Sequence, residues 1–206
     1  MTWVQESRNE FSQFKLIKSA ERSSKLFLGI NNAGKFCFMN GPLTKIEYCD
    51  TFDDLVYKTL YDLRAMNSNF TTMRHAWFLQ NGNVLIFENC DSSTDYIGGL
   101  WLIDTTANTF TKTLTFGSSK VLFLHRGSIA FNGDVIYYGE YGTWGYATKL
   151  WYSTNNGLTW QMLYDFANAP NVVSNGIHIH SVTWDSYWKR LWLAIVTGKQ
   201  IGRAHV

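Results

Sequence analysis

The 206-residue sequence has little proline, little cysteine and no long apolar run. Only two prolines occur, and no stretch is biased enough in composition to predict a long disordered segment. No apolar run reaches the roughly 18 residues that a membrane-spanning helix requires, so no membrane partner is expected. Residues 1–14 carry charges and lack an apolar h-region, so no secretory signal is visible there.

The sequence also lacks a strong charge of either sign. Its formal net charge is +2, which is too small to favour a nucleic acid or an anionic membrane surface as partner. The three cysteines, Cys37, Cys49 and Cys90, are an odd number without CxxC spacing. They predict buried or incidental thiols rather than a disulfide framework or a zinc site. No cofactor is expected.

The sequence is rich in apolar residues, at 46%, and in aromatic ones, at 17%, and it repeats itself. Residues 53–63 align with residues 155–166 through shared Leu, Tyr and Asp positions. Between them, Trp101 aligns with Trp151 and Phe116 with Phe166. These spacings divide the chain into units of about 50 residues.

The first half of each unit reads as a hairpin. Residues 78–89 and residues 129–140 each place an Asn-Gly pair between two apolar segments. Asn81-Gly82 and Asn132-Gly133 therefore predict type I′ turns, in which both central residues have positive φ. In the third unit, four strands are expected at about 123–131, 134–141, 147–153 and 159–165.

Tandem four-stranded units of this length are typical of β-propeller blades. A β-sandwich remains the alternative, although it has no reason to repeat every 50 or so residues. We therefore predict an all-β fold: a partial β-propeller of four-stranded antiparallel blades, with about three blades and the start of a fourth. The incomplete domain would span residues 1–200, with blades at roughly 15–63, 70–116, 121–166 and 176–200.

The last six residues, "IGRAHV", are interpreted separately. They match the translation of part of a common sequencing-library adapter. We expect residues 201–206 to be a non-native read-through tail and the natural protein to continue beyond about Gly198.

The stretch "STNNGLTW" fits the turn between the third and fourth strands of its blade. Its residues Ser153, Gly157, Thr159 and Trp160 match the pattern S-x-D-x-G-x-T-W, and Asn155 stands at the Asp position. The stretch resembles the Asp-box (BNR) repeat of sialidases and many other propellers. An Asx side chain can bond backbone N–H groups, glycine permits positive φ, and tryptophan can pack against the next blade. We expect structural roles for these five residues.

The resemblance to the sialidase-like propellers implies glycan binding and, in a complete protein, hydrolysis by an exo-acting glycoside hydrolase. Sialidases hold the substrate carboxylate with three arginines and attack with a tyrosine paired to a glutamate. The early Arg-Ile-Pro motif is absent here, so no catalytic residue is transferred. The fragment itself is expected to be inactive. A non-catalytic recognition or scaffold propeller remains the alternative.

Basic and imidazole side chains cluster where three units begin. These candidate ligand-binding residues are Arg74, His75, His125, Arg126, His178 and His180. In a propeller, they would form a cationic ring at the channel mouth that recognises a carboxylate, sulfate or phosphate of a glycan or other small anionic ligand. A histidine there could also act as acid or base. Alternatively, the ring pairs with acidic groups of neighbouring blades. No third ligand accompanies His178 and His180, so no metal is expected.

Two weaker candidates complete the set. Glu88, Glu140 and Asp185 could supply the paired carboxylates of a glycoside hydrolase, or could serve in ion pairs. The aromatic segment 137–146 could stack sugar rings, or could pack between blades.

Overall fold

The computed structural model describes residues 25–51, 56–122, 126–142, 146–168, 177–197 and 200–205. Short antiparallel strands dominate these residues. The helical segments are single turns: α2 (Leu63–Met66), η2 (Arg126–Ser128) and η3 (Phe166–Asn168). Within the described residues, no helix is long and apolar enough to cross a membrane.

Four sheets follow one another along the chain, each with its strands in sequence order. The first blade contains β1 (Leu26–Ile30), β2 (Phe36–Met39), β3 (Lys45–Cys49) and β4 (Lys58–Asp62). The second contains β5 (Met73–Phe78), β6 (Val84–Glu88), β7 (Gly99–Asp104) and β8 (Thr109–Thr115). The third contains β10 (Ile129–Asn132), β11 (Val135–Gly139), β13 (Lys149–Ser153) and β14 (Gln161–Asp165). The fourth contains β15 (Ile177–Asp185), β16 (Arg190–Thr197) and β17 (Gln200–His205).

The same irregularity recurs in the first three blades. The register between the third and fourth strands shifts at Ile46/Glu47 in the first, at Leu100/Trp101 in the second and at Leu150/Trp151 in the third. A β-bulge bends a strand and increases its twist. Its recurrence at one place in each blade shows that the 50-residue unit of the sequence is also a unit of backbone geometry.

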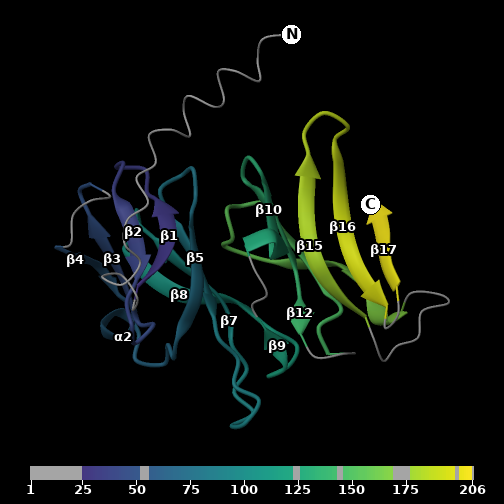
Figure 1. Ribbon diagram of the computed structural model, residues 1–206, viewed down its shortest axis with the longest axis horizontal. Coiled ribbons are helices and arrows are strands. Elements are labelled where there is room, and N and C mark those ends of the chain that lie inside the picture. Colours follow the sequence, from purple (N-terminus) through teal and green to yellow (C-terminus); the bar gives the residue numbers. More distant parts are fainter. Residues whose placement is uncertain are drawn as a thin grey trace.

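Hydrophobic cores lie between neighbouring blades. One cluster joins the first blade to the second, for example Ile46 with Trp101. Another joins the second to the third through Phe87 and Tyr138, and the last joins the third to the fourth through Leu150 and Ile179. Figure 1 shows the purple first blade and the yellow fourth blade on opposite sides of the molecule. Face-to-face packing of four-stranded blades confirms the predicted all-β partial propeller.

The type I′ turns predicted at the Asn-Gly pairs do not form. Gly82 and Gly133 have positive φ, of 90° and 58°. Asn81 and Asn132 do not belong to the described residues with positive φ. The Asn81 side chain instead accepts a hydrogen bond from the Asn83 N–H at 3.1 Å, so it closes an Asx turn. Asparagine thus contributes its side chain here, and glycine alone supplies the unusual backbone conformation.

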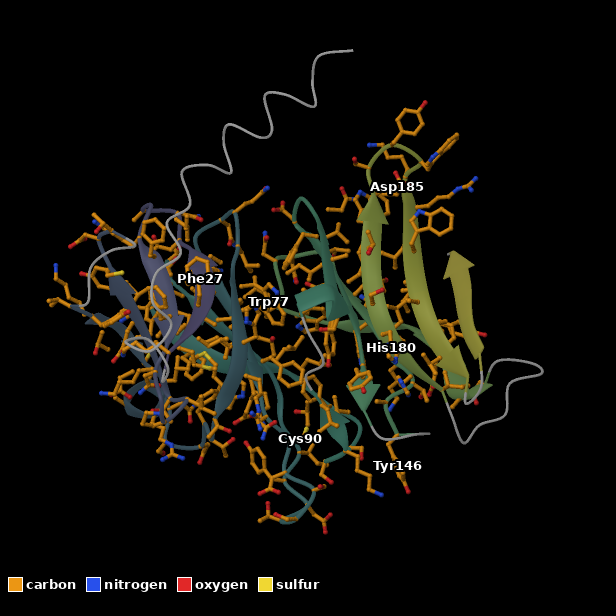
Figure 2. All side chains as sticks on the ribbon, viewed as in Figure 1. Phe27, Trp77, Cys90, Tyr146, His180 and Asp185 are labelled. Carbon is orange, nitrogen blue, oxygen red and sulfur yellow. The ribbon has the colours of Figure 1, made fainter. Side chains whose placement is uncertain are left out.

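The antiparallel order gives each blade two ends. At the turn end lie the first-to-second hairpins and the Ser153–Trp160 turn. At the crossover end lie the second-to-third connections and the starts of β5 and β15. A two-stranded sheet of β9 (Val121–Leu122) and β12 (Tyr141–Gly142) adds to the crossover end. Figure 2 shows His180 and Tyr146 towards this end and Asp185 at the turn end.

The fourth blade includes most of the predicted tail. Residues 201–205 belong to β17, which pairs with β16 in antiparallel register from Thr197↔Gln200 to Trp192↔His205. This pairing does not test the origin of residues 201–206, so the non-native tail stays a prediction.

Candidate ligand-binding face

Two histidines meet at the start of β15. The Nε2 atoms of His178 and His180 lie 2.8 Å apart, and the rings stack with centroids 4.8 Å apart at 27°. Residues two apart on a strand share a face, which brings the two imidazoles together. The register shift between Ile179 and Ser181 alters the strand at this point.

The Tyr141 ring packs against both imidazoles. Its ring meets His178 edge-on at 4.9 Å and His180 at 5.3 Å. Tyr141 belongs to β12, which pairs with β9 through Tyr141↔Leu122 and Gly142↔Val121. A Cβ at Gly142 would stand 2.2 Å from the Lys120 carbonyl oxygen, so only glycine permits this approach. The β9–β12 pair therefore fixes Tyr141 beside the histidines.

Burial determines the protonation state of His178. His178 is 5% exposed, and its Nδ1 is buried without a hydrogen-bond partner among the described residues. Burial lowers the pKa of His178, and His180 lowers it further. A proton on Nδ1 would be an unsatisfied buried donor, so Nε2 of His178 carries the hydrogen and donates to His180. His180 then holds its own proton on Nδ1. His178 is therefore neutral at pH 7 and orients His180 rather than supplying charge.

The other predicted ligand residues are placed differently. Arg74 is exposed, and its Nε donates to Asn89 Oδ1 at 3.0 Å. His75 is 2% exposed and meets the Trp77 ring edge-on at 4.8 Å, so it faces the interior. His125 and the Arg126 side chain lie outside the described residues, while the Arg126 backbone begins η2. The structure thus brings His178 and His180 together and turns His75 away from solvent.

One cation at this end was missed in the sequence. Lys120 Nζ lies 3.8 Å from the centroid of the exposed Tyr146 ring, in cation–π geometry. Lys120 immediately precedes β9, the strand that pairs with β12. The pairing of two-residue strands leaves no periodic pattern, so no sequence signal identifies this lysine.

Glu88 is fully engaged in structure. It is 0% exposed, and its Oε1 accepts hydrogen bonds from Thr71 N–H at 3.0 Å and Tyr96 OH at 2.7 Å. Its Oε2 accepts from Trp101 Nε1 at 2.7 Å and pairs with Lys112 Nζ at 2.9 Å. This carboxylate has no surface for a substrate.

Glu140 occupies the matching place in the third blade. It is also 0% exposed, and its Oε1 accepts from Trp151 Nε1 at 2.9 Å. Its Oε2 has no hydrogen-bond partner among the described residues. Burial raises the pKa of Glu140, while the Trp151 bond and the Lys149 charge oppose the rise. Glu140 is therefore buried in a less complete network than Glu88.

Asp185 lies at the turn end, away from both glutamates. Its Oδ1 accepts from the N–H groups of Tyr187 at 2.9 Å and Trp188 at 3.0 Å. The Trp188 bond is the largest of several that lower its pKa. Asp185 thus closes the β15–β16 turn, and the three carboxylates do not converge.

The aromatic segment 137–146 divides into two parts. Tyr138 is 0% exposed, and Tyr137 stacks on Trp184 of the fourth blade at 5.9 Å and 12°. Tyr141 and Tyr146 instead lie at the crossover end. Inter-blade packing therefore accounts for the first part, and the second remains available to a ligand. Trp144 lies outside the described residues.

The Ser153–Trp160 turn is closed by its own side chains. Ser153 Oγ accepts from the N–H groups of Gly157 at 2.9 Å and Asn155 at 3.3 Å. Asn155 Oδ1 accepts from Thr159 N–H at 3.0 Å, and its Nδ2 donates to Thr159 Oγ1 at 2.9 Å. Gly157 has φ of 81°. The Trp160 indole N–H lies 3.1 Å from Thr113 Oγ1 of the second blade and so joins two blades.

The cysteines and the possible metal ligands offer no further site among the described residues. Cys37, Cys49 and Cys90 are buried thiols, as predicted. Burial raises the pKa of Cys37 and of Cys90 to about 11, so neither is a reactive thiolate at pH 7. Over the described part of the chain, no group of three or more His, Cys, Asp or Glu side chains is placed to hold a metal ion.

No protein-family model and no curated protein matches the chain. Its fold is similar to two solved β-propeller proteins, YCF48 bound to D1 peptide and the GH74 enzyme of Niastella koreensis. YCF48 matches with a TM-score of 0.50 and 13% identity, over 82% of this chain and 47% of that one. The GH74 enzyme matches with a TM-score of 0.54 and 13% identity, over 87% and 28%.

A luciferin-regenerating enzyme matches with a TM-score of 0.54 and 12% identity, over 86% of this chain and 57% of that one. The chain spans less than two thirds of each of these three proteins. At such identities the likeness shows the β-propeller fold alone.

Proposed function

We propose that this chain is part of a β-propeller that binds an anionic glycan, or another small carboxylate, sulfate or phosphate ligand, at the crossover end. The observation that carries the proposal is the contact of His178, His180 and Tyr141. Two imidazoles of β15 and the aromatic ring of Tyr141 from β12 meet there.

Each group has a distinct part in binding. His180 is half-buried, and the hydrogen on its Nδ1 can be donated to a ligand oxygen while His178 holds the ring from behind. Tyr141 and Tyr146 offer aromatic surface to a sugar ring. Lys120 supplies positive charge, and Arg74 and Arg126 begin the second and third blades near the same end. Charge-assisted hydrogen bonds from these cations are about twice as strong as neutral ones.

The three candidate carboxylates support binding without hydrolysis. Glycoside hydrolases place two carboxyl groups on either side of the scissile bond. Glu88 and Glu140 are both 0% exposed, and Asp185 closes a turn at the opposite end. We therefore assign a recognition role to these 206 residues and expect no glycosidase turnover by them, whatever a longer protein does.

The Ser153–Trp160 turn supports placing this propeller with the Asp-box group, to which the sialidase-like proteins belong. Its hydrogen bonds give Ser153, Asn155 and Thr159 the structural parts that the pattern implies. The turn lies at the turn end, so it stabilises the blade and takes no part in the proposed ligand contact.

The test is titration calorimetry of the chain with N-acetylneuraminate and glucuronate, and with glucose as the neutral control. We expect both acids to bind, glucose to bind far more weakly, and Arg126→Ala and His180→Ala each to weaken acid binding about tenfold. Arg190→Ala is the matched control, because Arg190 is exposed at the turn end. Equal binding of glucose and the acids, or unchanged affinity in both variants, would overturn the proposal.

A further inference from the structure

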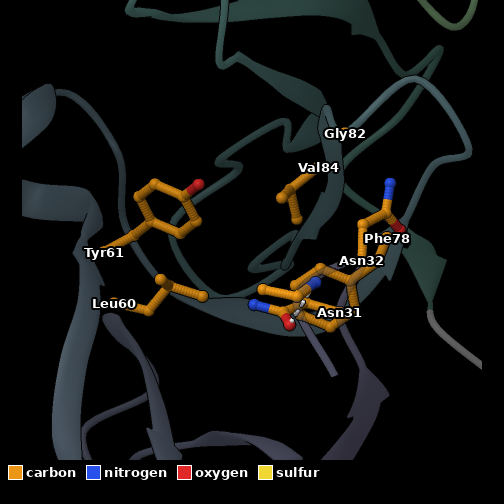
Figure 3. Close-up of a pocket in the computed structure, with 8 residues that line it drawn as sticks. Asn31, Asn32, Leu60, Tyr61, Phe78, Gly82 and Val84 are labelled. Carbon is orange, nitrogen blue, oxygen red and sulfur yellow. Dashed lines mark hydrogen bonds between the residues drawn. The ribbon is translucent and has the colours of Figure 1, made fainter. Parts of the chain in front are cut away.

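A cavity of about 180 Å³ opens between the first and second blades at the turn end. Leu60 and Tyr61 of β4 line it from the first blade, and Phe78 and Val84 line it from the second. The β1–β2 loop contributes Asn31, Asn32 and Ala33. Figure 3 shows Tyr61 and Leu60 on one side, Asn31, Asn32 and Phe78 on the other, and the Tyr61 hydroxyl pointing into the space between them.

The walls of the cavity are held in place. Asn32 Nδ2 donates to the carbonyl oxygens of Leu79 at 3.1 Å and Gln80 at 3.2 Å, so the loop of the first blade is tied to the hairpin of the second. Asn31 Oδ1 accepts from Ala33 N–H at 3.1 Å and Lys35 N–H at 2.9 Å, which closes the loop itself. Hydrogen bonds therefore fix the loop that borders the cavity.

The Tyr61 hydroxyl is a polar group at the cavity that has no described hydrogen-bond partner. Its ring packs against the core between the two blades. Burial, with a smaller effect of Cys37, raises the pKa of Tyr61, so the hydroxyl keeps its hydrogen at pH 7. It can donate one hydrogen bond and accept another.

We propose that this cavity binds a neutral, single-ring aromatic molecule that carries one hydrogen-bonding substituent. The size fits, because an apolar cavity of about 150 Å³ in another protein accommodates benzene. Leu60, Phe78 and Val84 supply the apolar contact, and Tyr61 supplies the directed hydrogen bond. No residue that lines the cavity carries a charge, so a neutral ligand is favoured over the anion proposed for the opposite end.

The test is an NMR titration of the 206-residue chain with phenol, and with toluene as the ring that lacks a hydroxyl. Phenol is expected to bind saturably with millimolar affinity and to shift amides of residues 31–35 and 79–84. Tyr61→Phe should weaken phenol about fivefold, the effect of one neutral hydrogen bond, and leave toluene unchanged. Tyr48→Phe is the matched control, because Tyr48 packs against the same core without lining the cavity.

A parallel titration with N-acetyl-tyrosinamide identifies the source of the ring. Tighter binding than phenol, at the same amides, assigns the cavity to a tyrosine side chain of a partner protein; weaker binding assigns it to a free small molecule. The proposal is overturned if no probe saturates, if the shifts lie elsewhere, or if Tyr61→Phe and Tyr48→Phe weaken phenol equally. Because glucuronate is expected at the crossover end, its binding has no bearing on this result.

Discussion

Replacing Glu88 by Gln should destabilise the protein far more than the same change at Glu140. Glu88 Oε1 faces Thr71 N–H and Tyr96 OH, while Oε2 faces Trp101 Nε1 and Lys112. The amide of Gln must turn its NH₂ towards one of these sides, where it meets an obligatory N–H donor. A partnered buried charge is lost and a donor is left unpaired, which costs about 3 kcal/mol.

In Glu140→Gln, the amide can be placed without opposing two N–H donors. Its oxygen can face Trp151 Nε1, which keeps the hydrogen bond that Oε1 accepts at 2.9 Å. Oε2 has no hydrogen bond to a described residue that the substitution could remove. The NH₂ group is then an unsatisfied donor, and the carboxyl group no longer has to be buried. We expect Glu140→Gln to cost about 1 kcal/mol or less.

The assay is urea unfolding at pH 7, followed by tryptophan fluorescence, with both variants measured against the parent chain. The expected gap between the two variants is about 2 kcal/mol in the free energy of unfolding. Costs equal within about 0.5 kcal/mol would refute the reasoning that the partners of the carboxylate, and not its burial alone, determine its contribution.

Three further outcomes are expected. Ser153→Ala removes the acceptor of two turn N–H groups and should lower the free energy of unfolding in urea by about 2 kcal/mol. Thr154→Ala, at the exposed neighbouring position, should lower it by less than about 0.5 kcal/mol, and similar costs for the two variants would contradict the role of Ser153. Trp160→Phe removes the indole N–H, which is shared between Thr113 Oγ1 and the Gly157 carbonyl oxygen, and should cost about 1 kcal/mol; an unchanged midpoint would show that these bonds do not stabilise the fold. Because burial raises the pKa of Glu140, the folded state holds the carboxyl proton more tightly, and stability should fall as pH rises above the ordinary glutamate pKa. Glu140→Gln should lose this pH dependence of stability in a series of thermal melts at different pH. An identical pH dependence in the variant would show that another group causes it.

Much of the fold could be predicted because the residues that repeat along the sequence are the ones that make the packing contacts within each blade. Trp101 and Trp151 align in the sequence, and each donates its indole hydrogen to a buried glutamate of its own blade. The bulges at the adjacent strand pairs recur in the same way. Composition and spacing report such local features directly.

The turns and the site were less predictable. The Asn-Gly pairs indicated type I′ turns, yet Asn81 closes its loop through its side chain, an alternative that the dipeptide does not distinguish. His75 follows Arg74 on a first strand, but the side chains of a strand alternate, and His75 faces the core while Arg74 faces solvent. Lys120 was missed because its neighbour Tyr146 is brought near only by the β9–β12 pairing.

Anion binding at the crossover end, beside the histidine pair, can be located by mapping backbone amide shifts during a glucuronate titration at pH 7. We expect saturable shifts at residues 120–122, 139–142 and 177–181. Saturable shifts confined to the turn end, or no saturable shifts at all, would contradict it.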